Sequence, residues 1–280
     1  MRVLVTGAGG QLGSVLPGAL DGHEVLALDR ATLDLADREG VEAVVASFVP
    51  HAVVNAAALT NVDRCETDPA AAYAANALGV RFLAVAASRV GAHVVHVSTD
   101  YVFDGRARRA YHEFDPVAPI QEYGRSKLAG EVELERHAAS WAVARTSWVF
   151  GRRGGDFVSW CLASTPDDVR PVLDDQVSRP TYAPDLAMVL ARLAVERIPG
   201  VFHVANRGEC TRYQLAVDAL ALVGRDDSTI RRVSGADLAR PAARPAYSAM
   251  QSLALEASGV PEPRDYRDAL GEYLAGERIP

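Results

Sequence analysis

Short apolar runs rich in valine, leucine and alanine alternate with helical patterns through the first half of the chain. The runs lie at 2–6, 24–28, 52–56, 93–98 and 142–146. Helical periodicity fills the intervening segments 41–48, 69–90 and 123–139. Strands that alternate with helices form a parallel sheet covered by helices on both faces, with right-handed crossovers. The pattern therefore predicts an α/β fold built on a doubly wound parallel sheet.

The alternation becomes irregular after about residue 149. Turn-rich segments lie at 151–155 and 240–245, and between them come a strand pattern at 201–205 and a helical pattern at 211–223. We expect residues 1–148 to form the sheet domain, with a strand–helix pair within 177–204 returning to it. The smaller carboxy-terminal α/β lobe should then consist of residues 149–176 and 205–280.

Composition and charge exclude several classes of protein. The chain has 280 residues, of which 49% are hydrophobic, so it can bury a large core, and its net charge of -7 disfavours binding to nucleic acids. The longest apolar stretches are expected to fall far below the ~20 residues of a membrane span. Cys65, Cys161 and Cys210 are widely spaced and form no metal-type pair, as expected for reduced thiols. We expect a soluble, cytoplasmic protein with no nucleic-acid or membrane partner.

A glycine-rich loop follows the first strand and precedes an apolar helical pattern that runs to Leu20. Glycines stand at Gly7, Gly10 and Gly13, with Gln11 and Leu12 between them. In a strand–loop–helix context, the first glycine permits a tight turn, the second lets the backbone approach a pyrophosphate, and the third allows close helix packing. The pyrophosphate would lie at the amino terminus of the helix. The motif predicts a Rossmann-type dinucleotide-binding domain.

The end of the second strand bears on the choice of dinucleotide. Asp29 lies at the position where a carboxylate binds the adenosine ribose of NAD. The neighbouring Arg30 is suited to the 2′-phosphate of NADP, or is simply a solvated surface residue. Asp34 and Leu35 follow on the next loop and are candidates for the adenine side of the site. Both NADPH and NADH therefore remain open.

Tyr123 and Lys127 stand four residues apart in a predicted helix and so project from one face. A free phenol has a pKa near ~10, and a neighbouring ammonium or a positively charged nicotinamide ring would lower it. Tyr123 would then act as a general acid toward a carbonyl oxygen, while Lys127 would bind the nicotinamide ribose.

Hydroxyl groups also follow the strand at 93–98. Ser98 and Thr99 lie at its carboxyl end, which is where ligands bind in open α/β sheets. Either hydroxyl can donate a hydrogen bond to a carbonyl oxygen that gains negative charge as hydride arrives. The two residues are alternatives for this role on the sequence alone.

Taken in order along the chain, these motifs resemble those of the extended short-chain dehydrogenases, and more narrowly those of the dTDP-4-dehydrorhamnose reductases. The resemblance rests on the glycine loop and on segments that run through nearly the whole chain: 55–58 (NAAA), 98–105 (STDYVFDG), 123–131 (YGRSKLAGE), 145–150 (RTSWVF), 174–181 and 244–248.

The resemblance implies hydride transfer from NADPH or NADH to C4 of a dTDP-4-keto-6-deoxy sugar, with dTDP-L-rhamnose as the usual product. It implies Thr99, Tyr123 and Lys127 as the catalytic set and adds Ala56, Ala57 and Ala58 to the cofactor site. By the same matching, the dTDP-sugar would be bound by Thr60, Val62, Asp100, Tyr101 and Trp148, with Arg244 at its diphosphate.

The sequence departs from the family pattern at a metal site. Some members bind magnesium at a dimer contact through glutamates, where this chain has Val15 and Pro184. Hard cations need oxygen ligands, so we expect no metal there and not that particular dimer, although a homodimer of another kind remains open.

Other functions stay open beside the reductase. The lobe that selects the nucleotide sugar matches less closely, so another 4-keto sugar, including a streptose-type sugar, is an alternative. A sugar-nucleotide epimerase or dehydratase of the same superfamily is a second alternative. A dehydratase would place acidic partners beside the catalytic threonine, whereas here a single Asp100 is followed by Tyr101. A nucleotide-binding regulatory subunit, like the β subunit of methionine adenosyltransferase, is an alternative of a different class.

Overall fold

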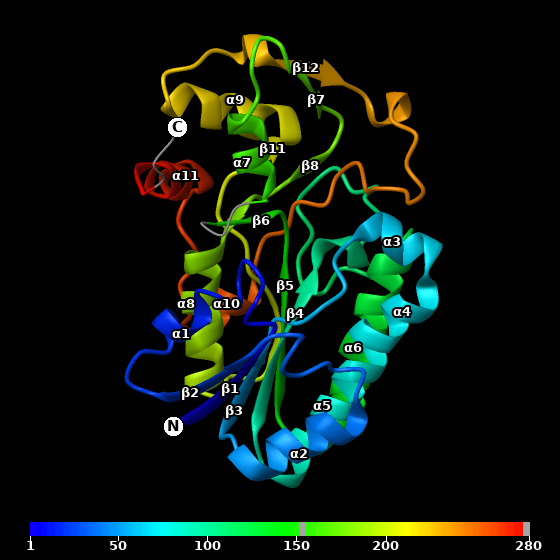
Figure 1. The fold of residues 1–280 in the computed structure, drawn as a ribbon, viewed down its shortest axis with the longest axis vertical. Helices are drawn as coiled ribbons and strands as arrows, with labels where there is room; N and C mark the ends of the chain where they lie inside the picture. The colour runs from blue at the N-terminus through cyan, green and yellow to red at the C-terminus, as the bar shows by residue number, and fades with distance from the viewer. Residues whose placement is uncertain (152–154, 277–280) are drawn as a thin grey trace.

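The computed structural model describes residues 1–151 and 155–276, and a six-stranded parallel sheet forms its centre (Figure 1). The strand order is β10-β5-β4-β3-β1-β2. The strands are β1 (Arg2–Thr6), β2 (Glu24–Leu28), β3 (Ala52–Asn55), β4 (His93–Thr99), β5 (Trp141–Thr146) and β10 (Gly200–His203). The predicted doubly wound parallel sheet is therefore confirmed. β1 lies between β2 and β3, so the strand order reverses direction between β1 and β3. Such a reversal opens a crevice at the carboxyl ends of these two strands.

Helices cover both faces of the sheet, because alternate residues of each strand place apolar side chains on opposite faces. One face packs against α1 (Leu16–Ala19), α8 (Ala183–Val195) and α10 (Ala254–Ala257), and the other against α2 (Arg38–Phe48), α5 (Gly79–Arg89) and α6 (Glu122–His137). Within β1, Val3 and Val5 point to the first face and Leu4 to the second. All three side chains are fully buried, which explains the continuous apolar runs in the sequence.

The stretch Pro69–Arg89 is one helical segment of 21 residues made of α4 (Pro69–Tyr73), η1 (Ala74–Leu78) and α5. By length and composition it would suit a membrane span, so the expectation that no stretch approaches this size was wrong. Half of its most apolar window is buried in the fold, as in a core helix. The middle turn, η1, is a π-helix, and its Asn76 bonds both backbone groups of Leu59 and the hydroxyl of Ser126. It thereby fixes the segment that follows β3 against α6.

The carboxy-terminal segments gather at the carboxyl end of the sheet, in the upper half of Figure 1. They are α7 (Phe157–Leu162), β7 (Arg170–Leu173), β8 (Val177–Ser178), β11 (Cys210–Thr211), α9 (Arg212–Leu222), β12 (Ile230–Val233) and α11 (Tyr266–Ala275). β6 (Val149–Phe150) and β9 (Thr181–Tyr182) pair beneath them. Phe150, Tyr182 and Tyr273 form the aromatic centre of this lobe. The predicted turn at 151–155 lies partly outside the described residues, which omit 152–154.

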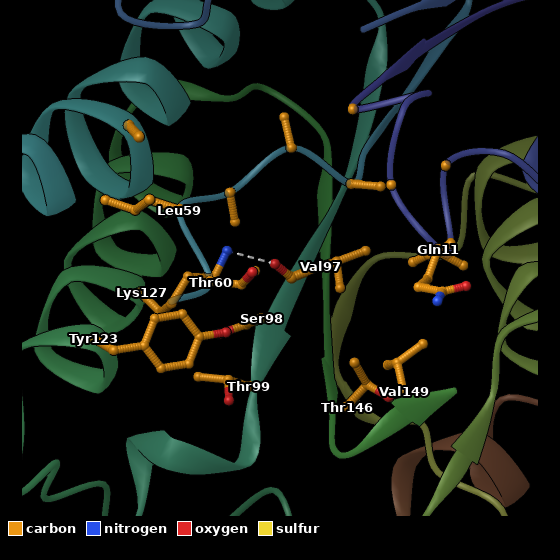
Figure 2. A pocket seen from close by; sticks show the side chains of 18 of the residues that line it. Gln11, Leu59, Thr60, Val97, Ser98, Thr99, Tyr123, Lys127, Thr146 and Val149 are labelled. Carbon is orange, nitrogen blue, oxygen red and sulfur yellow. Dashed lines mark hydrogen bonds between the residues drawn. The ribbon is translucent and has the colours of Figure 1, made fainter. Parts of the chain in front are cut away.

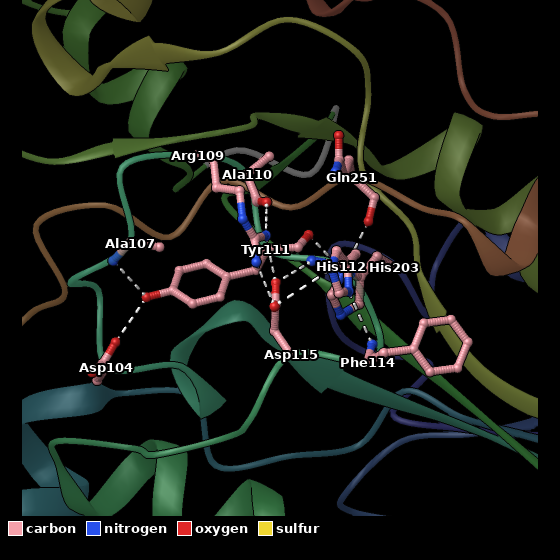
Figure 3. A network of polar contacts seen from close by, with 10 residues as sticks. All are labelled: Asp104, Ala107, Arg109, Ala110, Tyr111, His112, Phe114, Asp115, His203 and Gln251. Carbon is pink, nitrogen blue, oxygen red and sulfur yellow. Dashed lines mark hydrogen bonds and ion pairs between the residues drawn. The ribbon is translucent and has the colours of Figure 1, made fainter.

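The loop after β4 is held by a network of polar contacts (Figure 3). Asp115 accepts two hydrogen bonds from the guanidinium of Arg109, and the hydroxyl of Tyr111 donates to Asp104. The ring of His203, at the end of β10, reaches the backbone carbonyls of Tyr111 and Gln251. This network joins the sheet to the carboxy-terminal segment. Its residues 104–115 do not line the cleft and support the structure around it.

Candidate active site

A cleft of about 620 Å³ opens at the carboxyl ends of the parallel strands. It runs from the loop after β1, past the segment after β3 and the end of β4, to the lobe beyond β5. Figure 2 shows Tyr123, Lys127, Ser98 and Thr99 close together, with Gln11 across the cleft from them. The cleft brings together every predicted site residue except Asp29 and Arg244.

The loop after β1 is shaped by glycines. Gly7 has φ +74°, and a Cβ there would lie 2.6 Å from the backbone nitrogen of Ala57. A Cβ on Gly13 would lie 2.0 Å from the carbonyl oxygen of Gly7, so neither position accepts a side chain. The predicted helix is shorter than expected, because α1 spans only Leu16–Ala19 and turns precede it. The loop therefore offers backbone groups rather than a long helix terminus to a pyrophosphate.

The two residues after β2 occupy different positions. Asp29 does not line the cleft, and its Oδ1 accepts hydrogen bonds from the backbone nitrogens of Ala31 and Thr32. Arg30 does line it, with a side chain that is 77% exposed and only a long 3.4 Å contact to Asp34. The geometry therefore favours Arg30 over Asp29 as the residue that faces the cleft.

Tyr123 lies in the first turn of α6, which Gln121 caps by accepting a hydrogen bond from Gly124. Burial raises the pKa of Tyr123, and its hydrogen bond with Thr99 offsets only part of that effect. The expected lowering of this pKa by a neighbouring ammonium was therefore wrong for the structure, because desolvation outweighs the opposing contacts. The phenol keeps its proton at neutral pH, which is the state that a proton donor requires.

Lys127 follows one helical turn later and is fully buried except toward the cleft. Its Nζ donates a 2.7 Å hydrogen bond to the carbonyl of Val97 and lies 3.2 Å from Nε2 of His96. Burial lowers the pKa of Lys127 to about 8, against a smaller opposing effect of Glu131. The amine is thus fixed at the end of β4, beside Tyr123.

The two hydroxyls at the end of β4 are not equivalent. Ser98 donates a 2.5 Å hydrogen bond to Glu131, which also binds Arg145. Thr99 donates to Asp100 and shares a hydrogen bond with Tyr123. Because its neighbour on the cleft is the phenol, Thr99 is the better placed of the two to bind a carbonyl oxygen.

Asp100 lies at the base of the cleft and joins the two parts of the molecule. Its carboxylate accepts hydrogen bonds from Thr99 and from Ser178 and Ser248 of the carboxy-terminal segments. Burial raises the pKa of Asp100 to about 6 despite these bonds. Its oxygens are thus already used by the protein, so Asp100 positions Thr99 rather than offering a free carboxylate.

Trp148 forms a wall of the cleft in a backbone conformation that is uncommon for a bulky side chain, with φ +44°. The guanidinium of Arg212, the first residue of α9, lies 3.8 Å from the centroid of the indole and 4.8 Å from that of Phe157. One face of the indole of Trp148 is therefore covered by a cation.

Several cleft residues were missed from the sequence: Gly9, Leu33, Leu59, Ala75, Val97, Thr146, Ser147, Val149, Phe157 and Arg212. The sequence did hold a signal for Thr146 and Ser147. Hydroxyl residues stand at the carboxyl end of the predicted strand 142–146, as Ser98 and Thr99 do at that of 93–98. No spacing pointed to Phe157 or Arg212, because both reach the cleft from the carboxy-terminal lobe.

Arg244 is not part of the cleft. Its guanidinium donates hydrogen bonds of 2.6 and 2.9 Å to the two carboxylate oxygens of Asp63 and borders a second cavity of about 490 Å³. The expected role at the diphosphate is therefore not supported, because Arg244 does not line the cleft and its guanidinium is paired with Asp63.

No group of three His, Cys, Asp or Glu side chains is arranged as a metal site within 1–151 and 155–276. Val15 and Pro184 lie at the starts of α1 and α8, which pack against each other.

The chain is similar to known proteins over nearly its whole length. Residues 1–279 match the family model described as the RmlD substrate binding domain. The chain is 42% identical to dTDP-4-dehydrorhamnose reductase from Mycobacterium tuberculosis, over 98% of this chain and 92% of that protein. It is 40% identical to the spore coat polysaccharide biosynthesis protein SpsK from Bacillus subtilis, over 98% and 96%. A crystal structure of dTDP-4-dehydrorhamnose reductase from Bacillus anthracis in complex with NADP superposes with a TM-score of 0.94, at 34% identity and 99% coverage of both chains.

Proposed function

Because this chain belongs to the RmlD substrate binding domain family, we propose that it is an NAD(P)H-dependent reductase of a dTDP-4-keto-6-deoxy sugar. Its substrate is dTDP-4-dehydro-L-rhamnose and its product is dTDP-L-rhamnose. The observation that carries the proposal is the grouping of Thr99, Tyr123 and Lys127 at the base of a cleft whose other end is the glycine loop.

The cleft fits a dinucleotide by its own construction. The glycine loop leaves no room for Cβ atoms, the segment 56–58 adds an apolar wall, and Lys127 points an amine inward. A nicotinamide dinucleotide, when bound, supplies the hydride. Residues Gly7, Gly10 and Gly13 would hold its pyrophosphate, and Lys127 its nicotinamide ribose.

The protein's own residues then complete the reduction of a ketone. When the C4 oxygen is bound, Thr99 turns its single hydroxyl proton from Asp100 to that oxygen and stabilises the negative charge that develops there. Tyr123 transfers its phenolic proton to the same oxygen, so that the C4 keto group becomes a hydroxyl. Lys127, once protonated, stabilises the phenolate left on Tyr123.

We propose NADPH as the preferred dinucleotide. Arg30 lines the cleft with a largely exposed guanidinium, and its contact to Asp34 is too long to hold it firmly. A 2′-phosphate would pair with this guanidinium at two donors. Asp29, the residue suited to the ribose hydroxyls of NAD, uses one oxygen in its own turn.

We propose Arg212 in place of Arg244 as the cation that meets the anionic part of the nucleotide sugar. Arg212 lies in the cleft between Trp148 and Phe157, where the partly desolvated guanidinium would bind a phosphate oxygen more strongly than in water. Trp148 would lie against the apolar face of the hexose.

The test is the oxidation of NADPH and NADH followed by absorbance, with dTDP-4-dehydro-L-rhamnose generated in place by its upstream enzymes. Consumption that requires this protein, together with identification of dTDP-L-rhamnose as the product, supports the proposal. Binding of NADPH without consumption would overturn this substrate and favour another 4-keto sugar nucleotide or a regulatory subunit.

A further inference from the structure

A continuous chain of buried hydrogen bonds runs from β1 to the amine of Lys127. It passes from Thr6 to Asn55 on β3, then to His96 on β4, and ends at Nζ of Lys127 on α6. None of these four side chains is more than 1% exposed. Because water does not reach the hydrogen bonds between these side chains, each donor must face an acceptor. The direction of one hydrogen bond therefore constrains the direction of the next.

The amide of Asn55 has a fixed orientation. Its Oδ1 lies 3.1 Å from the backbone nitrogen of Ala57, which can only donate, and 2.7 Å from the hydroxyl of Thr6. The oxygen of the amide must therefore point to Ala57. The Nδ2 group consequently points to His96, with 3.0 Å between Nδ2 and Nδ1 of the imidazole.

The orientation of Asn55 fixes the tautomer of His96. An amide NH₂ only donates, so Nδ1 of His96 must accept and carries no proton. Burial of the whole ring lowers the pKa of His96 well below its usual value, so the ring is neutral. A neutral imidazole that accepts at Nδ1 must carry its proton at Nε2.

The proton on Nε2 faces the amine of Lys127. Nζ lies 3.2 Å from Nε2 and already donates to the carbonyl of Val97. An ammonium has three donors and no acceptor, so it would set N–H against N–H at this contact. A neutral amine has one lone pair, which accepts from His96, and keeps one N–H for Val97 and one for the cleft.

We propose that His96 is a positioning residue which, held by Asn55 as the tautomer protonated at Nε2, donates a hydrogen bond to Nζ of Lys127 and favours the neutral amine in the free protein. Protonation of Lys127 then requires His96 to change tautomer and Asn55 to rotate, at the cost of the bond from Ala57. The series of hydrogen bonds thus couples the charge of Lys127 to the backbone of Ala57, in the segment that follows β3.

Other charged and titratable groups around Lys127 do not account for this preference. Glu131, one turn further along α6, opposes it, because a carboxylate favours the ammonium. Glu131 is itself paired with Arg145 of β5 at 2.7 Å, which offsets its charge. Tyr123, the remaining titratable neighbour on the cleft side, is neutral. His96 is therefore the group in direct contact that discriminates between amine and ammonium.

The sequence makes the test unusually direct, because Lys127 is the only lysine in the chain. Protein produced with lysine labelled with ¹³C at Cε gives one lysine resonance, whose position follows the ionisation of Nζ. We expect it to titrate more than about one pH unit below the ordinary lysine value of ~10.4. ¹⁵N labelling of the seven histidines, with the His96 signals assigned by their loss on substitution, should show protonation at Nε2.

His96→Gln removes the fixed N–H donor, because a glutamine amide can present its oxygen to an ammonium. We expect the Lys127 titration to move upward by about one unit or more, a tenfold change in the ratio of ammonium to amine. His93→Gln is the matched control, because His93 is buried on the same strand but contacts Ser140. It should leave the lysine titration unchanged.

The lysine titration and the determination of the His96 tautomer need no substrate, so their results are independent of the proposed reaction. A Lys127 resonance that titrates near the ordinary lysine value in the wild-type protein would overturn the inference even if the variants do not fold. A His96 ring protonated at Nδ1 would also overturn it. So would equal lysine titrations in wild type and His96→Gln. If the proposed function also holds, the alkaline limb of kcat/KM should move upward in His96→Gln and not in His93→Gln.

Discussion

The guanidinium of Arg212 lies over the indole of Trp148, 3.8 Å from the ring centroid. The two residues come from distant parts of the sequence. Trp148 lies just after β5, and Arg212 is the first residue of α9 in the carboxy-terminal lobe. This contact places a cation and an aromatic plane at the lobe end of the cleft, where we propose that the nucleotide sugar binds.

Arg212→Gln should weaken binding of the nucleotide sugar. Loss of a charge-assisted hydrogen bond costs ~1.5–3 kcal/mol, so we expect KM for the sugar nucleotide to rise about 10- to 100-fold with little change for the dinucleotide. Steady-state kinetics with each substrate varied in turn measures this. Arg232→Gln is the control, because Arg232 lies over Tyr213 of the same lobe but outside the cleft. An unchanged KM in Arg212→Gln would remove this residue from the binding site.

Tyr123→Phe should lose turnover and keep dinucleotide binding. The substitution removes the proton donor but leaves the ring against Tyr101, 5.9 Å between centroids. General acid catalysis contributes ~10²–10⁴-fold, so kcat should fall by a factor in that range. Single-turnover kinetics and fluorescence titration with NADPH separate the two effects. Full turnover in this variant would show that another group supplies the proton.

Gly13→Ala should damage the dinucleotide site, whereas Gly18→Ala should not. A Cβ on Gly13 would overlap the carbonyl of Gly7 at 2.0 Å, so the glycine loop must move. Nothing lies within 4 Å of a Cβ on Gly18, which is inside α1. We expect ~5- to 150-fold weaker NADPH binding in the first variant, because the overpacking cost of ~1–3 kcal/mol falls on the dinucleotide site. Gly18→Ala should bind normally and unfold at an equal or slightly higher temperature. Equal affinities of the two variants would exclude the loop as the pyrophosphate site.

Arg30→Ala should alter the choice of dinucleotide. If Arg30 pairs with the 2′-phosphate, its removal raises the dissociation constant for NADPH by ~10-fold or more and leaves that for NADH nearly unchanged. Parallel fluorescence titrations at constant ionic strength provide the comparison. A similar loss for both dinucleotides would indicate that Arg30 only supports the loop after β2.

Features that depend on short stretches of sequence were predictable. The strands of the sheet followed from apolar runs at 2–6 and 93–98, because buried parallel strands need apolar residues on both faces. Tyr123 and Lys127 followed from the four-residue repeat of a helix, and the glycine loop from its position after a strand. In each case the distance along the chain sets the distance in space.

Features that depend on contacts between distant segments were decided by the tertiary structure alone. Arg244 binds Asp63 instead of the cleft, Arg212 reaches Trp148, and desolvation sets the pKa of Tyr123 against the direction expected from its charged neighbour. The bonds from Asn55 to His96 and on to Lys127 join three different elements. Local periodicity determines which face a side chain occupies within its own helix or strand. Which partner meets that face, and how much water is left there, depends on how the elements pack, and these two quantities fix the charge and the chemistry of the site.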